Sequence, residues 1–98
     1  MIKVFKLISG EEIISKCEGM DQNKDYTLES PAAIMMQRTE QGVGVGLAPY
    51  MPYASGRIKL HANAIASSAD ADLKMENEYN RLFGSGIQIA PAGSIAGL

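Results

Sequence analysis

Five runs rich in β-branched and aromatic residues, separated by turn residues, occupy the chain up to residue 66. β-branched and aromatic residues favour strands, whereas Gly, Pro, Asn and Asp favour turns. About five short strands predict a mainly β fold, either a small, strongly bent five-stranded antiparallel sheet or a partly open barrel. The runs cover residues 2–8, 12–18, 26–37, 42–47 and 57–66.

Two of these runs allow more than one arrangement in the sheet. Pro31 cannot donate to a strand ladder, so it should kink the third strand or lie at a sheet edge. Residues 57–66 form either one strand or two strands around a turn at His61-Ala62-Asn63.

The fourth run alternates glycine with large apolar residues. Val43, Val45 and Leu47 should share one face, because side chains of a strand alternate between faces. The three glycines then leave the other face bare, so that another backbone can approach it closely.

A helix should follow the strands. Ser67 or Ser68 can cap its first turn, and Gly84 can end it, which predicts a helix over residues 68–83. One face of this helix carries an apolar stripe made of Ala71, Met75, Tyr79, Leu82 and Phe83. We expect residues 1–84 to form the domain. The tail 85–98 is apolar and uncharged, and at least its first half should dock on its own domain or on a neighbour.

Size and charge restrict the class of protein. A chain of 98 residues supports one domain with a modest core, and it gains apolar burial by oligomerisation. The net charge of −2 gives no global basic field that would attract nucleic acid. Cys17 is the single cysteine, which fits a reducing, cytoplasmic setting, and we expect it to be a small buried apolar residue. No apolar run approaches the ~20 residues that span a bilayer, and no membrane partner is expected.

Residues 5–28 have a recognisable order of apolar, glycine and acidic positions. Two alternating apolar residues precede Gly10, an apolar-Asp pair follows ten residues later, and a last leucine closes the segment. This spacing resembles the first motif of the Sm-like proteins, although Ser15, Cys17 and Asp25 stand where the family has Gly, Leu and Asn. The matching positions are Phe5, Leu7, Gly10, Met20, Asp21 and Leu28.

Residues 60–65 (LHANAI) resemble the second motif of the same family. Leu60, Asn63 and Ile65 match, whereas His61 replaces the arginine and Ala62 replaces the glycine. These departures, with a C-terminal rather than an N-terminal helix, are what we expect of a remote branch of the family, encoded by a bacterium or a phage. The resemblance implies a homo-oligomeric ring that binds single-stranded RNA at its pore or on one face.

The resemblance also implies which residues would bind RNA. Asn23 lies at the stacking position, Asp25 at the base-edge position and His61 at the arginine position, and Asn63 matches directly. Lys24 adds a positive charge beside them.

Two further residues of the motifs are expected to be structural. Gly10 supplies a positive φ where two strands reverse, and Asp21 fixes its turn by accepting hydrogen bonds from backbone N–H groups two residues on.

Nothing in the sequence favours an enzyme. His61 is the only histidine, so histidines cannot form a catalytic pair or a metal cluster. No segment suggests the apolar pocket that would raise the pKa of one of two paired carboxylates. We therefore expect a binding protein with no cofactor, no metal and no small-molecule substrate. The alternative is a structural or protein-interaction module of the same fold with no nucleic-acid role, which the missing arginine, the acidic balance and the apolar tail favour.

Overall fold

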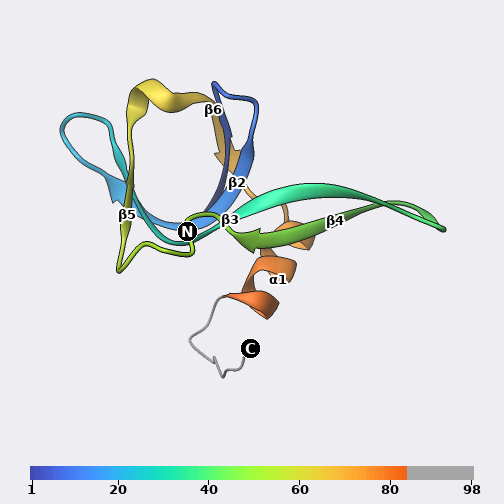
Figure 1. The fold of residues 1–98 in the computed structure, drawn as a ribbon. Helices are drawn as coiled ribbons and strands as arrows, with labels where there is room; N and C mark the ends of the chain where they lie inside the picture. The colour runs from blue at the N-terminus through green and yellow to red at the C-terminus, as the bar shows by residue number, and fades with distance from the viewer. Residues whose placement is uncertain (84–98) are drawn as a thin grey trace.

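The computed structural model describes residues 1–83 as one antiparallel sheet that curls on itself and carries a helix on one face (Figure 1). The strands run in the order β4-β3-β2-β1-β6, and β5 pairs with β3. This mainly β fold is the one predicted, and it is consistent with a partly open Sm-like barrel. The elements are β1 (Ile2–Leu7), β2 (Glu12–Met20), β3 (Tyr26–Thr39), β4 (Gly42–Pro49), β5 (Ile58–Leu60), the 3₁₀ turn η1 (Ala62–Ala64), β6 (Ile65–Asp70) and α1 (Leu73–Leu82).

The sheet has six strands because residues 57–66 do not form one strand. Of the two alternatives that the sequence leaves open, the structure has two strands around a turn, with η1 between β5 and β6. β5 pairs with β3 at one side of the sheet, whereas β6 pairs with β1 at the other. The short turn between them therefore connects the two ends of the sheet and gives the curl seen in Figure 1.

The curled sheet has a core on each face. Ile13 and Ile14 are both fully buried and point to opposite faces, as adjacent strand residues do. The inner cluster includes Cys17, whose burial confirms the prediction for this residue. The outer cluster lies under α1. Its members are Ile14, Ala32 and Tyr79, with Ile2, Val4, Ile34, Leu47, Ala71, Met75 and Phe83 packed against them.

The helix begins later than the sequence predicts. Residues 68–70 belong to β6, where Ser68 pairs with Phe5 and Asp70 with Lys3, so the predicted start at residue 68 is wrong. Pairing with β1 overrides the local capping preference of the serines, and Asp72 caps α1 instead by accepting a hydrogen bond from Met75 N at 2.8 Å. In the predicted stripe, Leu82 is the exception, because it is exposed while the other four members pack on the sheet.

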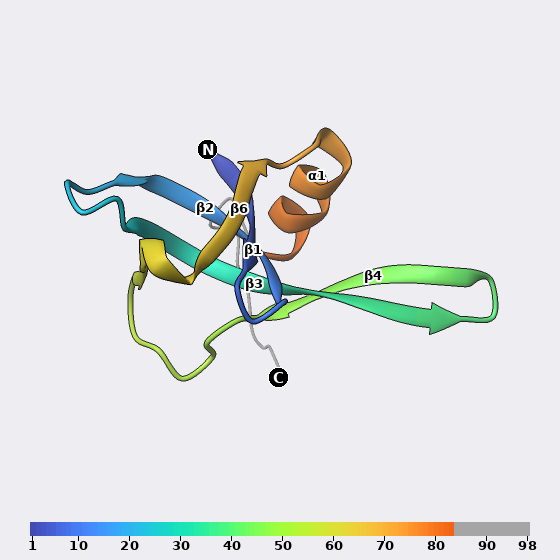
Figure 2. The same ribbon diagram turned by 90° about the horizontal axis from the view of Figure 1, so that it is seen from above.

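β3 changes partner at Ser30 and Pro31. Its first residues pair with β5, and from Ala32 onward the same edge pairs with β4 (Figure 2). Ser30 has a φ of 55°, which is outside the strand region, and Pro31 cannot donate to a ladder. Opposite this point, the register of β2 shifts between Ile14 and Lys16. Pro31 therefore interrupts the regular strand, as its lack of an N–H group predicts.

Two buried hydroxyls bind the backbone at this interruption. The hydroxyl of Tyr79, from α1, is 2.8 Å from the carbonyls of Glu29 and of Ser30, to either of which it can donate. It also accepts from Lys16 N at 3.2 Å. Ser15 is fully buried, and its hydroxyl is 3.0 Å from the Glu29 carbonyl and 2.9 Å from the Lys16 carbonyl. Burial raises the pKa of Tyr79 above its ordinary value of 10.0, so the hydroxyl keeps its proton at neutral pH.

We expect Tyr79→Phe to lower the free energy of unfolding by about 1–3 kcal/mol, because it leaves buried backbone groups without a partner. Urea unfolding followed by circular dichroism measures this loss. The matched control is Tyr53→Phe, since the Tyr53 side chain is 98% exposed and should lose nothing measurable. Equal stabilities of the two variants would show that the Tyr79 hydroxyl does not hold the bend.

Candidate nucleic-acid interface

Two turns meet at one end of the curled sheet. Residues 21–25 connect β2 to β3, and residues 61–64 connect β5 to β6. Because Tyr26 pairs with Leu60, the residues that precede and follow this pair, Asp25 and His61, are brought together. The two segments that resemble Sm-like motifs therefore meet in space.

Asp21 fixes the first turn. Its Oδ1 accepts hydrogen bonds from Asn23 N at 2.8 Å and from Asp25 N at 3.0 Å, and Lys24 takes a positive φ of 68°. These are the bonds expected of an Asp at a turn. The backbone N–H of Asp25 is the main cause that lowers the pKa of Asp21, and Asn23 N–H and Lys59 lower it further.

Asp25 joins the first turn to the second. Its Oδ1 accepts a hydrogen bond from Ala62 N at 2.8 Å, and its Oδ2 lies 3.4 Å from His61 Nδ1. The side chain is only 14% exposed. Both carboxylate oxygens thus have partners within the protein, so Asp25 positions the second turn rather than presenting a free acceptor.

The other predicted binding residues face solvent. Asn23, Lys24, His61 and Asn63 are exposed, and 66% of the His61 side chain is accessible. Two amides, one ammonium and one imidazole can together hydrogen-bond base edges, contact a phosphate and stack on a base. Gly10 belongs to a third turn, between β1 and β2, where its φ of 97° requires a glycine.

Lys59 is a member of this cluster that the sequence did not indicate. Its Nζ lies 3.4 Å from Asp21 Oδ2, which places a second cation beside the turn. In the sequence it is one of several lysines scattered along the strands. The available signal was its position two residues before His61, because residues two apart on an extended segment tend to share a face.

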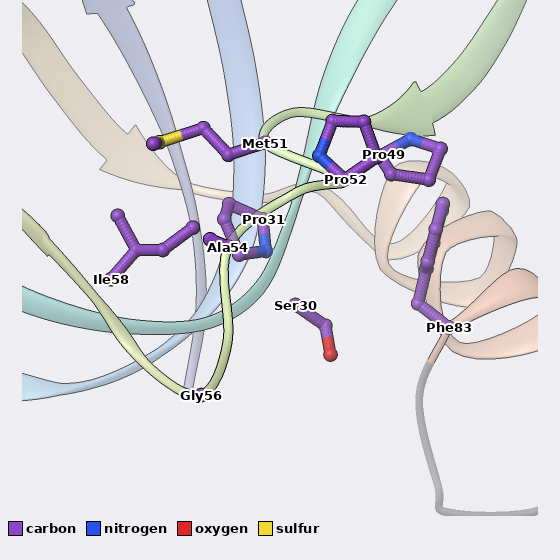
Figure 3. A pocket seen from close by; sticks show the side chains of 9 residues that line it. All are labelled: Ser30, Pro31, Pro49, Met51, Pro52, Ala54, Gly56, Ile58 and Phe83. Carbon is purple, nitrogen blue, oxygen red and sulfur yellow. The ribbon is translucent and has the colours of Figure 1, made fainter.

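A cavity of about 230 Å³ lies near the interruption of β3, away from these turns (Figure 3). The close-up shows three prolines and Phe83 around it, with Met51 and Ile58 opposite. The described residues that line it are uncharged, so they offer no acidic or basic side chain for acid–base chemistry and no cation for a phosphate.

Residues 1–83 contain neither a group of three or more His, Cys, Asp or Glu side chains that could hold a metal ion nor a helix long and apolar enough to cross a membrane. Comparison with protein-family models and with curated proteins finds no match for the chain. The Sm-like resemblance therefore depends on the two motif segments themselves.

We expect Asp25→Ala to separate the two turns. The amide hydrogen of Ala62 should then exchange with solvent at least about tenfold faster, since the loss of one hydrogen bond of about 1.5 kcal/mol corresponds to that factor. Hydrogen exchange followed by NMR measures it. Asp25→Asn keeps an oxygen that can accept from Ala62 N and should preserve most of the protection. Unchanged exchange in Asp25→Ala would contradict the positioning role.

Asp21 should titrate below its ordinary value of 3.8. Because its pKa is lowered by folding, its contribution to stability is complete above that value and is lost as the pH falls through the folded-state pKa. Carboxyl NMR titration measures the midpoint. Lys59→Met should raise this midpoint only in part, since the Asp25 N–H group is the larger cause. A midpoint at or above 3.8 in the unaltered protein would refute the turn geometry.

Proposed function

We propose that this protein assembles into a homo-oligomeric Sm-like ring and binds single-stranded RNA across the turns 21–25 and 61–64. The observation that carries the proposal is the Asp25 carboxylate. This carboxylate contacts His61 and Ala62, which follow Asp25 by 36 and 37 positions in the chain. It thereby builds one polar surface from two motifs. The protein would act as a binding protein rather than as an enzyme.

The strand edges support assembly. In the part of the chain that the structure describes, the outer edges of β4 and of β6 have no strand beside them. Unpaired edges are ready to pair with another chain. β4 and β6 are different surfaces at opposite ends of the strand order, so their pairing between copies is head-to-tail, and such a contact gives a ring when the rotation closes.

The charge distribution supports a contact with phosphate at the turns. Asp21 is paired with Lys59, and Asp25 lies against His61. Among residues 1–83, no carboxylate forms an ion pair with Lys24. A ring would repeat this unpaired cation once per copy around one face, which supplies locally the field that the net charge of −2 does not.

Native mass spectrometry with a short oligouridine tests both parts of the proposal. We expect a defined oligomer that carries bound RNA. A monomer that remains folded at high concentration would overturn the ring, and an oligomer that never binds RNA would overturn the RNA role.

Lys24→Ala and His61→Ala should each weaken oligouridine binding while leaving the fold intact, because both side chains are exposed. Binding should fall as salt rises, and because Lys24→Ala removes this lysine from every copy, the slope of log K against log salt should fall by about 0.7 for each copy whose Lys24 contacts a phosphate. Fluorescence anisotropy over a salt series measures this. The matched control is Lys6→Ala, which removes an exposed lysine of β1 that belongs to neither turn. Equal losses in Lys6→Ala would show that the turns are not the binding surface.

The second candidate function is a protein-interaction module of the same fold. The observation that favours it is the exposed apolar surface of β3 and β4, where Met36 and Val43 are 71% and 65% accessible. An oligomer indifferent to RNA and to salt would favour this function.

A further inference from the structure

The chain continues beyond α1 from the edge of the cavity beside the interruption of β3. Phe83, which lines this cavity, is the last residue that the structure describes (Figure 3). The tail 85–98, for which the sequence predicts docking, lies outside the described residues. Only Gly84 separates Phe83 from the tail, so the tail starts beside the cavity.

Phe83 is held at this edge by Tyr79. The two rings stack with their centroids 5.5 Å apart, and Phe83 N donates to the Tyr79 carbonyl at 2.8 Å. The Tyr79 hydroxyl in turn binds the backbone of Glu29 and Ser30. The point from which the chain continues is therefore fixed by the same contacts that hold the interruption of β3.

The opposite wall of the cavity is formed by the segment that follows β4. Tyr50 N donates to the Pro31 carbonyl at 2.8 Å, and the Tyr50 side chain packs on the inner core. Met51 comes next, lines the cavity and is 47% exposed. This wall is thus anchored to the domain while part of its apolar surface is accessible.

The volume and the lining of the cavity suit aliphatic side chains. The volume of about 230 Å³ exceeds the ~150 Å³ of an apolar cavity that holds benzene, and it is below the ~300 Å³ at which small-molecule sites begin. Among the described residues that line the cavity, Ser30 alone has a polar side chain. These properties favour branched apolar side chains of a peptide over a charged or drug-sized ligand.

The tail supplies such side chains within a short reach. Ile87 and Ile89 follow Phe83 by four and six positions, after the sequence Gly-Ser-Gly. Four residues span at most about 14 Å, so Ile87 is confined to the neighbourhood of the cavity. Residues two apart in an extended segment share a face, and the two isoleucines can therefore enter the cavity together.

The tether favours this tail over a peptide from another protein. A segment joined by a short flexible linker reaches an effective concentration on the order of mM, and Gly and Ser make a linker flexible. A partner peptide would have to exceed that concentration or bind more tightly. Residues 84–98 also carry no charged side chain, which matches the uncharged lining of the cavity.

We propose that the first half of the tail folds back on its own domain and fills this cavity, with Ile87 and Ile89 packed against Met51 and Ile58. The contact covers apolar surface that residues 1–83 leave accessible. It is a property of the single chain, so it does not rest on the proposed ring or on RNA binding.

Methyl NMR of the full chain tests the proposal directly. With labelled Met and Ile methyl groups, we expect nuclear Overhauser cross-peaks from Met51 to Ile87 or Ile89. The variants Ile87→Val and Ile89→Val each remove one labelled isoleucine methyl and so assign the cross-peaks. A second sample, refolded from Met-labelled chains mixed with Ile-labelled chains, should lack them. Absence of the cross-peaks in the first sample overturns the proposal. Their presence in the mixed sample also overturns it, because another copy would then fill the cavity.

Oxidation of Met51 by hydrogen peroxide gives an independent measurement, since a covered thioether is less accessible to the oxidant. Ile87→Asp should speed sulfoxide formation at Met51 at least about tenfold, because a charge replaces a buried isoleucine. The matched control is Ile95→Asp, which makes the same change in the second half of the tail and should leave the rate unaltered. Met36, which is 71% exposed, reports the oxidant dose in each sample. Equal Met51 rates in the two aspartate variants overturn the proposal and leave the ring and its RNA binding untouched.

Discussion

The interruption of β3 at Ser30 and Pro31 is the constraint on which the rest of the structure depends. A positive φ at Ser30 and the missing N–H group of Pro31 stop the regular ladder. A backbone conformation such as that of Ser30 costs about 1–3 kcal/mol, so it persists only where the surrounding structure holds it. Two buried hydroxyls, from Ser15 and Tyr79, bind the backbone groups at this point. Since Tyr79 belongs to α1, the bond that holds the interruption also fixes the helix on the sheet.

This interruption divides one strand between two surfaces of opposite character. Before it, β3 pairs with β5 and starts at the turn where Asp25 holds His61 and Ala62. After it, β3 pairs with β4 in a hairpin on which Met36 and Val43 are exposed. A polar turn and an exposed apolar surface are thus carried by the same 14-residue strand. The interruption lies between the two surfaces.

The sequence predicts those parts of the fold that depend on local chemistry. Strand-forming runs, the effect of Pro31 and the alternation in β4 are properties of neighbouring residues, and the structure shows all three. The start of α1 could not be predicted in this way. Ser67 and Ser68 have the local chemistry of a helix cap, but their pairing with Lys6 and Phe5 depends on a strand more than 60 residues away.

The same limit applies to the candidate site. The motif spacing indicates Asn23, Asp25 and His61, and the structure brings the turns that carry them together. The motif spacing does not indicate that both oxygens of Asp25 have partners, or that Lys59 lies beside Asp21. Each of these contacts depends on the pairing of β3 with β5. Long-range register is the information that a single sequence lacks.

The acidic residues of the turns are less unfavourable for RNA than their number suggests. The Asp21 carboxylate accepts hydrogen bonds from two backbone N–H groups, which stabilises the turn. The nearby Lys59 ammonium partly compensates its negative charge. Asp25 is mostly covered, and its oxygens face Ala62 N and His61. What remains exposed is Lys24 with two amides and an imidazole. One such cation gives little affinity alone, since each phosphate contact adds a modest electrostatic term. In the proposed ring, repetition would add these terms along one strand of RNA, so that affinity for RNA would depend on assembly.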